Sequence, residues 1–227
     1  MPPRALSPSG LFLIDKQEGP SSFAVVADVR RRTGARTGHA GTLDPFATGL
    51  LLVLSGSATK LASYFVGLDK RYVTDIDLTA VTDTGDREGS VVERADPPSE
   101  GELERRLGPL RGEIELPIPT ASAVKIGGER AYRLHRLGVG VDMPLRRSRV
   151  DALDVISYGD GVARLDLFVS SGTYVRAIAA ALGGHCTTLR RTEVGPFRVD
   201  EANPERLVTP NEALARIGVR EGGGVGA

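Results

Sequence analysis

Residues 38–51, which read Gly-His-Ala-Gly-Thr-Leu-Asp-Pro-Phe-Ala-Thr-Gly-Leu-Leu, place one carboxylate, Asp44, among glycines and directly before a proline. Pro45 disfavours the α conformation at Asp44 and pushes that residue toward an extended or turn geometry. The glycines allow the backbone to approach a ligand closely. The run therefore predicts a loop that directs a reactive acid. The ordinary alternative is a helix start with Asp44 as N-cap and Pro45 at the first helical position.

The run resembles the catalytic-loop signature of the tRNA pseudouridine synthase B (TruB) family, Gly-His-x-Gly-Thr-Leu-Asp-Pro-x-Ala-x-Gly-x-Leu, and every fixed position matches. Three further stretches agree with the family in the same order. They are Ile14-Asp15-Lys16 with Gly19 and Ser22, then Lys70-Arg71-Tyr72, then Ser171-Gly172-Thr173-Tyr174-Val175-Arg176. Because four separate strings coincide along nearly the whole chain, the sequence is identified as a member of this family.

The resemblance implies an α+β pseudouridine synthase fold, with a mixed, largely antiparallel central sheet flanked by helices and loops. Residues 1–220 would form the catalytic domain, and residues 122–149 a thumb inserted into it that contacts RNA. Residues 221–227 are expected to be a disordered tail. We expect this protein to lack the small C-terminal RNA-binding domain usual in the family, and therefore to bind the acceptor arm more weakly.

The same resemblance implies an isomerase that converts uridine to pseudouridine at position 55 in the T-loop of tRNA, after flipping the base into a pocket. The reaction breaks the bond from ribose to uracil N1, rotates the base and rejoins it through C5. It requires no cofactor and no metal. Asp44 would be the catalytic carboxylate, acting either as nucleophile or as base, and the sequence leaves both variants open.

Further site residues follow from the family match. Arg176 would pair with Asp44 and hold it ionised, and Tyr72 would stack on the flipped uracil and take the C5 proton. Substrate contacts are expected from His39, Tyr174, Leu189, Lys16, Lys70, Lys125, Arg130 and Arg133, with Arg136 beside the last two in the thumb. Without the resemblance, Arg176 would be interpreted as a surface arginine and Tyr72 and Leu189 as core residues.

Charge placement favours a nucleic-acid partner although 29 basic and 29 acidic residues cancel. Basic residues gather in the first third of the chain, in residues 125–149 and near the C-terminus, whereas residues 75–104 are rich in acids. Two basic clusters flank residues 38–51, which favours phosphate contacts over a merely solvated surface. The family resemblance implies that this partner is tRNA, bound through its T-stem-loop, and we expect no obligate protein partner.

Composition indicates a cytoplasmic globular protein. A hydrophobic content of 41% supports a sizeable core. The first residues lack a secretory apolar stretch, and the longest aliphatic run, residues 50–54, is too short to span a membrane. The single Cys186 forms no internal disulfide, and histidines at 39, 135 and 185 lack the spacing of a zinc site. His185 and Cys186 are interpreted as packing or loop residues.

Local patterns predict strands at residues 11–14, 50–54, 72–78 and 162–170, and helices at residues 23–32, 58–64, 100–107 and 174–182. Ser21-Ser22 would cap the first helix and Thr33-Gly34 would end it. The apolar face of that helix would consist of Phe23, Val26, Ala27 and Val29. In residues 72–78 the alternation predicts a strand with one solvated face.

The sequence departs from the family pattern at a few positions. Gln17 and Ser21 replace the usual proline and threonine, and Ala181 precedes Leu182-Gly183 where an aspartate is customary. The connection from Gly183 to Leu189 is also short. These departures affect the geometry near Lys16 and Leu189 and leave the three predicted catalytic residues in place.

Two other functions compete. Asp75-Ile76-Asp77-Leu78-Thr79 matches the Asp-x-Asp-x-Thr pattern of magnesium-dependent aspartate phosphatases, with Asp75 and Asp77 as the reactive pair. A compact apolar strand should precede that pattern, but residues 71–74 are mixed. The second alternative is a non-catalytic module that binds or folds tRNA with the same surface. Its expected feature would be the loss of Asp44, which is present.

Overall fold

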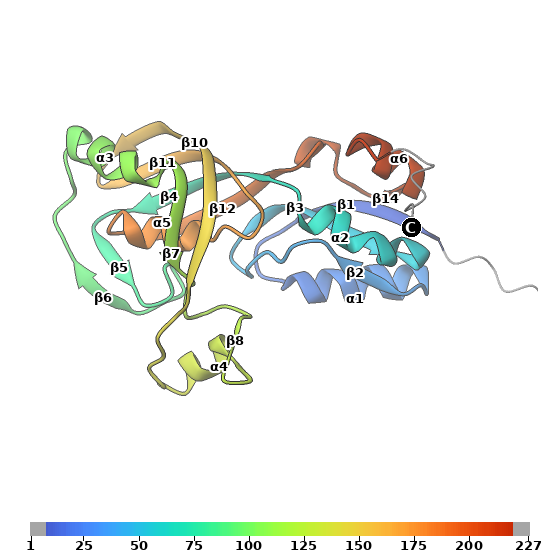
Figure 1. Cartoon of the computed structure of the whole chain (residues 1–227), viewed down its shortest axis with the longest axis horizontal. Coiled ribbons are helices and arrows are strands. Elements are labelled where there is room, and N and C mark those ends of the chain that lie inside the picture. The colour runs from blue at the N-terminus through green and yellow to red at the C-terminus, as the bar shows by residue number, and fades with distance from the viewer. Residues whose placement is uncertain (1–7, 220–227) are drawn as a thin grey trace, which may run out of the picture. The chain divides into compact units, whose positions relative to one another are not determined.

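The computed structural model describes residues 8–219 and consists of two compact units (Figure 1). The first unit comprises Met1–Lys70 and Arg190–Ala227, and the second comprises Arg71–Leu189. The expected tail at residues 221–227 lies outside the described residues. The single catalytic domain expected over residues 1–220 stays a prediction, as does the extent of the thumb.

A sheet with the strand order β14-β1-β3-β12 forms the frame of the first unit. Its strands and helices are β1 (Gly10–Lys16), α1 (Ser22–Thr33), β2 (Thr37–His39), β3 (Thr48–Ser55), α2 (Ala62–Val66), β13 (Phe197–Arg198), β14 (Asn203–Val208) and α6 (Pro210–Arg216), with 3₁₀ turns at Gly56–Leu61 and Val199–Glu201. Strand β12 (His185–Val194) begins in the second unit and ends in the first. Strands β1 and β3 pair antiparallel, whereas β12 and β3 pair parallel.

The core of the first unit forms around β3, in which every residue from Gly49 to Ser55 is buried. A continuous apolar run of this kind is typical of a strand covered on both faces. Leu13 of β1 faces Leu52 of β3 across the ladder, and both belong to one hydrophobic cluster. The sheet and this cluster give the loop that precedes β3 a rigid support.

Helix α1 has the ends that the sequence predicts. The Ser21 side chain accepts a hydrogen bond from the Ala24 amide, and Gly34 closes the helix in the left-handed region at φ 63°. The expected apolar face is only partly buried, because Ser22 and Val29 point inward whereas 70% of Phe23 is exposed. Ser22 occupies the inward position at this end of the helix, so the next residue, Phe23, faces solvent.

The second unit contains a sheet with the order β12-β4-β11-β10-β7. Its elements are β4 (Lys70–Asp77, whose first residue belongs to the first unit), β5 (Ala80–Thr82), β6 (Val91–Arg94), α3 (Glu100–Leu107), a 3₁₀ turn at Gly108–Leu110, β7 (Gly112–Pro117), β10 (Leu145–Gly159), β11 (Val162–Val169) and α5 (Val175–Ala181). Strand β10 pairs antiparallel with both β11 and β7. Burial alternates along β4, as the pattern of residues 72–78 predicts.

A small subdomain lies within the expected thumb. It consists of the hairpin of β8 (Lys125–Ile126) and β9 (Glu129–Arg130), followed by α4 (Ala131–Arg136). The amides of Ala131 and Tyr132 donate to the carbonyls of Val124 and Ser122, which connects the helix to the segment directly before the hairpin. Figure 1 shows this subdomain set apart from the sheet of the second unit.

The predicted elements are present, and the α+β class with a mixed, largely antiparallel sheet is confirmed. One helix differs, because residues 58–64 divide between the 3₁₀ turn Gly56–Leu61 and the short helix α2. Within residues 8–219, none of the helices is long and apolar enough to cross a membrane.

Candidate active site

Asp44 is half-buried in the loop between β2 and β3. Its carbonyl accepts a hydrogen bond from the Ala47 amide at 3.1 Å, so residues 44–47 form a turn that leads directly into β3. The alternative prediction, a helix that begins at the Asp-Pro pair, is therefore wrong, and the prediction of a loop at this position is confirmed. The chain on each side of Asp44 is held by side chains from distant parts of the sequence.

Ser22 holds the residue before Asp44. Its Oγ donates to the Leu43 carbonyl at 2.9 Å and accepts from the Leu43 amide at 2.8 Å. Because Ser22 is fully buried in the first turn of α1, both backbone polar groups of Leu43 are fixed to that helix. Ser21 caps the helix, whereas the Ser22 hydroxyl holds the Asp44 loop.

Lys16 holds the residues after Asp44. The side chain is 1% exposed, and its Nζ donates to the carbonyls of Pro45 at 3.1 Å, Ala47 at 2.6 Å and Gln17 at 3.0 Å. The Gly19 amide adds a hydrogen bond to the Pro45 carbonyl at 2.9 Å. These contacts indicate that Lys16 supports the loop backbone, and its expected contact with substrate stays a prediction.

Arg191 of β12 provides the third anchor, which the sequence interpretation did not include. The side chain is 1% exposed, and its guanidinium donates to the carbonyls of Leu50 at 2.7 Å, Gly41 at 3.1 Å and Thr42 at 3.5 Å. The sequence signal that could have indicated its burial is the alternation of side chains along a strand, which puts Arg191 on the same face as the buried Leu189.

Gly49 is required by the close approach of β12 to β3. Its φ is 102°, and a Cβ at this position would lie 2.2 Å from the Arg191 carbonyl oxygen. Any other residue would therefore clash with the backbone that carries the third anchor. The backbone that approaches Gly49 closely is that of strand β12.

His39 ends β2 and is half-buried. Burial, followed by the positive charge of Arg191, lowers the pKa of its imidazole below the usual 6.5. Within residues 8–219 its buried Nδ1 has no hydrogen-bond partner. The ring is therefore neutral at neutral pH. His39 directly precedes the Asp44 loop in the chain.

Lys70 is also withdrawn from solvent, with 5% exposure. Its Nζ donates to the carbonyl of Val66 at 2.7 Å and to the carbonyl of Leu68. Burial and the nearby Arg191 lower the pKa of Lys70 to about 8, and Asp69 offsets part of that change. Its expected contact with substrate stays a prediction, because the contacts observed are with the backbone.

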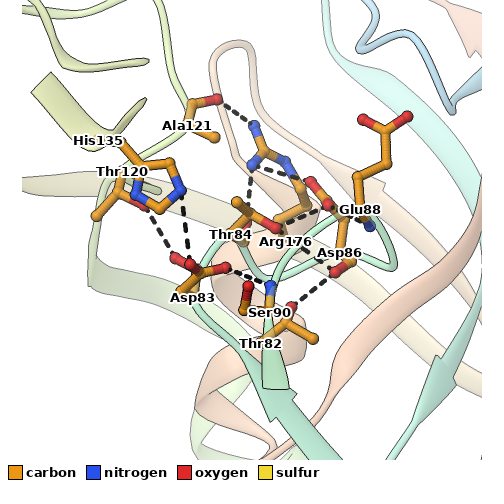
Figure 2. A network of polar contacts seen from close by, with 10 residues as sticks. All are labelled: Thr82, Asp83, Thr84, Asp86, Glu88, Ser90, Thr120, Ala121, His135 and Arg176. Carbon is orange, nitrogen blue, oxygen red and sulfur yellow. Dashed lines mark hydrogen bonds and ion pairs between the residues drawn. The ribbon is translucent and has the colours of Figure 1, made fainter. Parts of the chain in front are cut away.

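The second unit places Arg176 in a buried polar network (Figure 2). Its guanidinium donates to the carbonyls of Thr84 at 2.8 Å and Ala121 at 3.0 Å, and lies 3.2 Å from a carboxylate oxygen of Asp86. The other oxygen of Asp86 accepts from the Thr84 hydroxyl at 2.8 Å and the Glu88 amide at 3.0 Å. Arg176 is therefore a rigid interior residue, which contradicts its interpretation as a surface arginine.

Asp86 is a second residue that the sequence interpretation missed. Counted among the acids of residues 75–104, it gave no sign of its burial. The preceding residue, Gly85, packs closely against Arg176, because a Cβ there would lie 2.9 Å from the Arg176 carbonyl oxygen. The left-handed φ of 73° at Gly85 folds the loop so that the aspartate meets the arginine.

His135 links the thumb to the same loop. Its Nε2 lies 3.6 Å from a carboxylate oxygen of Asp83, whose other oxygen accepts from the Ser90 amide at 2.8 Å (Figure 2). The Thr120 hydroxyl donates to the Asp83 carbonyl at 2.9 Å. Helix α4 is thereby connected to the segment that carries Asp86.

The other predicted site residues fall into a group that is buried or half-buried and a group that is exposed. Tyr72 of β4 and Leu189 of β12 are each 7% exposed, and Tyr174 is half-buried directly before α5. Four thumb residues are exposed to solvent, namely Lys125, Arg130, Arg133 and Arg136. The pairing of Arg176 with Asp44 and all of the substrate contacts stay predictions.

The aspartates of the competing phosphatase pattern have local structural partners. One carboxylate oxygen of Asp77 accepts from the amide and the hydroxyl of Thr79, at 2.8 and 2.6 Å. Asp75 accepts from the Thr188 hydroxyl at 2.8 Å. The pattern therefore coincides with the end of β4 and a turn, and nothing in this geometry favours phosphoryl transfer. Residues 8–219 contain no group of three or more His, Cys, Asp or Glu side chains suited to a metal ion.

Comparison with known proteins identifies the family to which a chain with this site belongs. Residues 30–175 match the family model described as TruB family pseudouridylate synthase, N-terminal domain. The chain belongs to the TruB family. A tRNA pseudouridine synthase B of Leifsonia xyli subsp. xyli (strain CTCB07) is 44% identical over 222 residues, which cover 91% of this chain and 74% of that protein.

Solved structures share the fold of this TruB family chain. One chain in a crystal structure of a Cbf5-Nop10-Gar1 complex is 28% identical with a TM-score of 0.66, and the match covers 85% of this chain and 50% of that one. A pseudouridylate synthase is 17% identical with a TM-score of 0.52, over 94% of this chain and 75% of that one. The pseudouridine synthase fold expected from the sequence is therefore confirmed.

Proposed function

We propose that this TruB family chain isomerises uridine to pseudouridine in tRNA. It is an RNA-binding isomerase that modifies tRNA, and the observation that carries this conclusion is the complete family signature around Asp44. Three buried side chains, Ser22, Lys16 and Arg191, hold that loop in one geometry. A carboxylate on a preorganised loop meets the central requirement of the reaction, since the loop need not reorganise as the reaction proceeds.

The chemistry asks for one well-placed carboxylate and two proton transfers. Asp44 either attacks the nucleoside or removes a proton from it, which releases uracil N1 from ribose. The base then turns and C5 bonds to the ribose carbon. In the first variant this breaks the bond from Asp44 to that carbon, and in the second the proton that Asp44 removed returns to the ribose. N1 takes up a proton, and the C5 proton leaves last. We assign that last proton to Tyr72, whose ring also stacks on the uracil.

Arg176 is proposed as the partner that keeps Asp44 ionised. A guanidinium that is always protonated stabilises a nearby carboxylate and fixes its direction. Its bonds to Thr84 and Ala121 and its ion pair with Asp86 restrict the rotamers of Arg176. This rigidity supports the proposal, because a mobile arginine would hold a carboxylate less firmly.

The finer substrate assignment is the uridine at position 55 in the T-loop, recognised through the T-stem-loop. The exposed basic residues Lys125, Arg130, Arg133 and Arg136 support it by offering positive charge on a small separate subdomain. His39, Tyr174 and Leu189 are proposed to border the flipped nucleotide. We propose the cytoplasm as the compartment and no obligate protein partner.

Release of tritium from 5-tritiated uridine in an unmodified tRNA transcript tests the function. We expect the wild-type chain to release tritium from the T-loop uridine alone, with and without a chelator, and Asp44→Asn to release none. Glu18→Gln, a change of charge on the exposed turn before α1, is the control and should keep activity. A well-folded protein that binds tRNA without releasing tritium would favour the non-catalytic binding module instead.

A further inference from the structure

Among residues 8–70 and 190–219 of the first unit, Phe23 is the most exposed large apolar side chain, at 70%. It occupies the first turn of α1, where its neighbour Ser22 is fully buried. Leaving an aromatic ring in water forgoes the favourable free energy of burying it. A single exposed apolar residue is common on protein surfaces, so the surroundings of this ring decide whether it matters.

The ring of Phe23 forms an aromatic pair with His39. The centroids lie 5.2 Å apart with an interplanar angle of 77°, which is an edge-to-face arrangement. One side chain in such a pair restrains the other, so Phe23 is held although most of its surface is free. The imidazole is neutral at neutral pH, because burial and Arg191 lower its pKa. The pair is therefore an uncharged aromatic surface.

Backbone contacts fix this aromatic surface relative to the Asp44 loop. Phe23 directly follows Ser22, whose hydroxyl is bonded to both the amide and the carbonyl of Leu43. His39 is the other end of the connection, because it precedes the loop in the chain. The exposed ring and the predicted catalytic carboxylate thus belong to one rigid part of the first unit.

We infer that Phe23, held edge-to-face by His39, is a stacking platform for an unpaired nucleobase of the substrate RNA. Aromatic rings bind bases through their faces, with little dependence on sequence, and a ring that is 70% exposed has a face to offer. The first turn of α1 carries no acidic residue that would repel the RNA backbone. This inference rests on the proposed function, because it takes a folded RNA as substrate.

The chain contains no tryptophan, so a single substitution introduces a unique fluorophore. Phe23→Trp is prepared together with Asp44→Asn, which prevents turnover, and is titrated with an unmodified T-stem-loop RNA. We expect RNA to quench the tryptophan at position 23. Tyr64→Trp in the same background is the matched control, because Tyr64 is an aromatic residue of the first unit that is 50% exposed. Its fluorescence should not change.

Affinity gives the second measurement. Phe23→Ala should weaken binding of the T-stem-loop about 5- to 150-fold, the range that follows from losing one stacked base. Phe23→Tyr should restore it, and Tyr64→Ala should leave it unchanged. An abasic nucleotide is then placed at each T-loop position in turn, and at one position the penalty of Phe23→Ala should disappear. That position identifies the stacked base.

The inference is overturned if saturating RNA leaves the tryptophan at position 23 unquenched, or if Phe23→Ala binds RNA as tightly as wild type. It is equally overturned if Phe23→Ala acts by changing the association of the protein with itself, which sedimentation measures. Failure of the proposed function is a separate result, because it appears as absent tritium release from the wild-type chain. Equal melting temperatures of wild type and Phe23→Ala exclude a folding defect.

Discussion

Arg176 and Asp86 form a buried ion pair in which Nη1 and Oδ2 lie 3.2 Å apart and the two side chains are 3% and 6% exposed. A charge taken out of water is stable only when it is paired and its remaining hydrogen-bonding groups are satisfied. Here two carbonyls also accept hydrogen bonds from the guanidinium, and a hydroxyl and an amide donate to the carboxylate. Asp86 is therefore a positioning residue for Arg176.

Replacing Asp86 by Asn should lower the free energy of unfolding by about 3 to 5 kcal/mol, because it removes the carboxylate that lies 3.2 Å from the buried guanidinium. Urea unfolding measures this loss. Glu115→Gln is the control, since it breaks an exposed pair with Arg147 and should leave the midpoint nearly unchanged. An equal effect of both substitutions would contradict the assignment.

Lys16→Met should reduce kcat on tRNA by about 100-fold while KM changes little, because the carbonyls of Pro45 and Ala47 lose their donor and the loop shifts. Steady-state tritium release measures both constants. The exposed lysine Lys60 provides the control Lys60→Met, which should behave as wild type. If KM rises while kcat is unchanged, Lys16 contacts the substrate rather than supporting the loop.

Lys70 should make stability depend on pH between about 8 and 10.5. Its pKa falls from 10.5 in the unfolded chain to about 8 in the native state. Within that window the native state releases the proton while the unfolded state keeps it, so the free energy of unfolding rises with pH. Below pH 8 Lys70 is protonated in both states, so burying its charge lowers the free energy of unfolding by the full amount.

Comparison of Lys70→Met with wild type isolates this contribution from other groups that titrate at high pH. The stability difference between the two proteins, measured by urea unfolding from pH 7 to 10.5, should change in favour of wild type as pH rises. Parallel pH curves for the two proteins would show that Lys70 does not titrate in this range.

Neutralising Arg130, Arg133 and Arg136 together should weaken tRNA binding and flatten its salt dependence. Each lost phosphate contact reduces the slope of log K against log salt by about 0.7 to 0.9. Binding titrations at several salt concentrations measure this slope. The control neutralises Arg94, Arg105 and Arg164, which are exposed in the second unit outside the thumb. If the control flattens the slope equally, the effect comes from net charge and not from the thumb.

Local patterns were sufficient for most elements of the fold. The alternation of Tyr72, Thr74 and Ile76 predicts the buried face of β4, and Ser21 and Gly34 mark both ends of α1. These signals depend on neighbours in sequence, which is why they can be read without a structure. The loop around Asp44 was also recognisable, because its signature is contiguous.

Contacts between distant residues could not be predicted in the same way. Arg191 binds a carbonyl 141 positions away, and Arg176 bonds to a carbonyl 92 positions away. Charged residue types such as Lys16 and Lys70 are usually interpreted as surface groups, and only the fold supplies the carbonyls that make their burial tolerable. Phe23 is the opposite case. Helical spacing predicts that this apolar residue is buried, but it is exposed because the polar Ser22 occupies the inward position.

The three anchors of the Asp44 loop also bear on how this loop could be transplanted. Leu43 is bonded to Ser22, the carbonyls of Pro45 and Ala47 to Lys16, and the carbonyls of Gly41 and Thr42 to Arg191. A graft of residues 38–51 alone into another scaffold would leave these backbone groups without their donors. The smallest transferable module therefore comprises four separate pieces of chain, and a chimera that exchanges the signature without Lys16, Ser22 and Arg191 should display the sequence of the loop but not its shape.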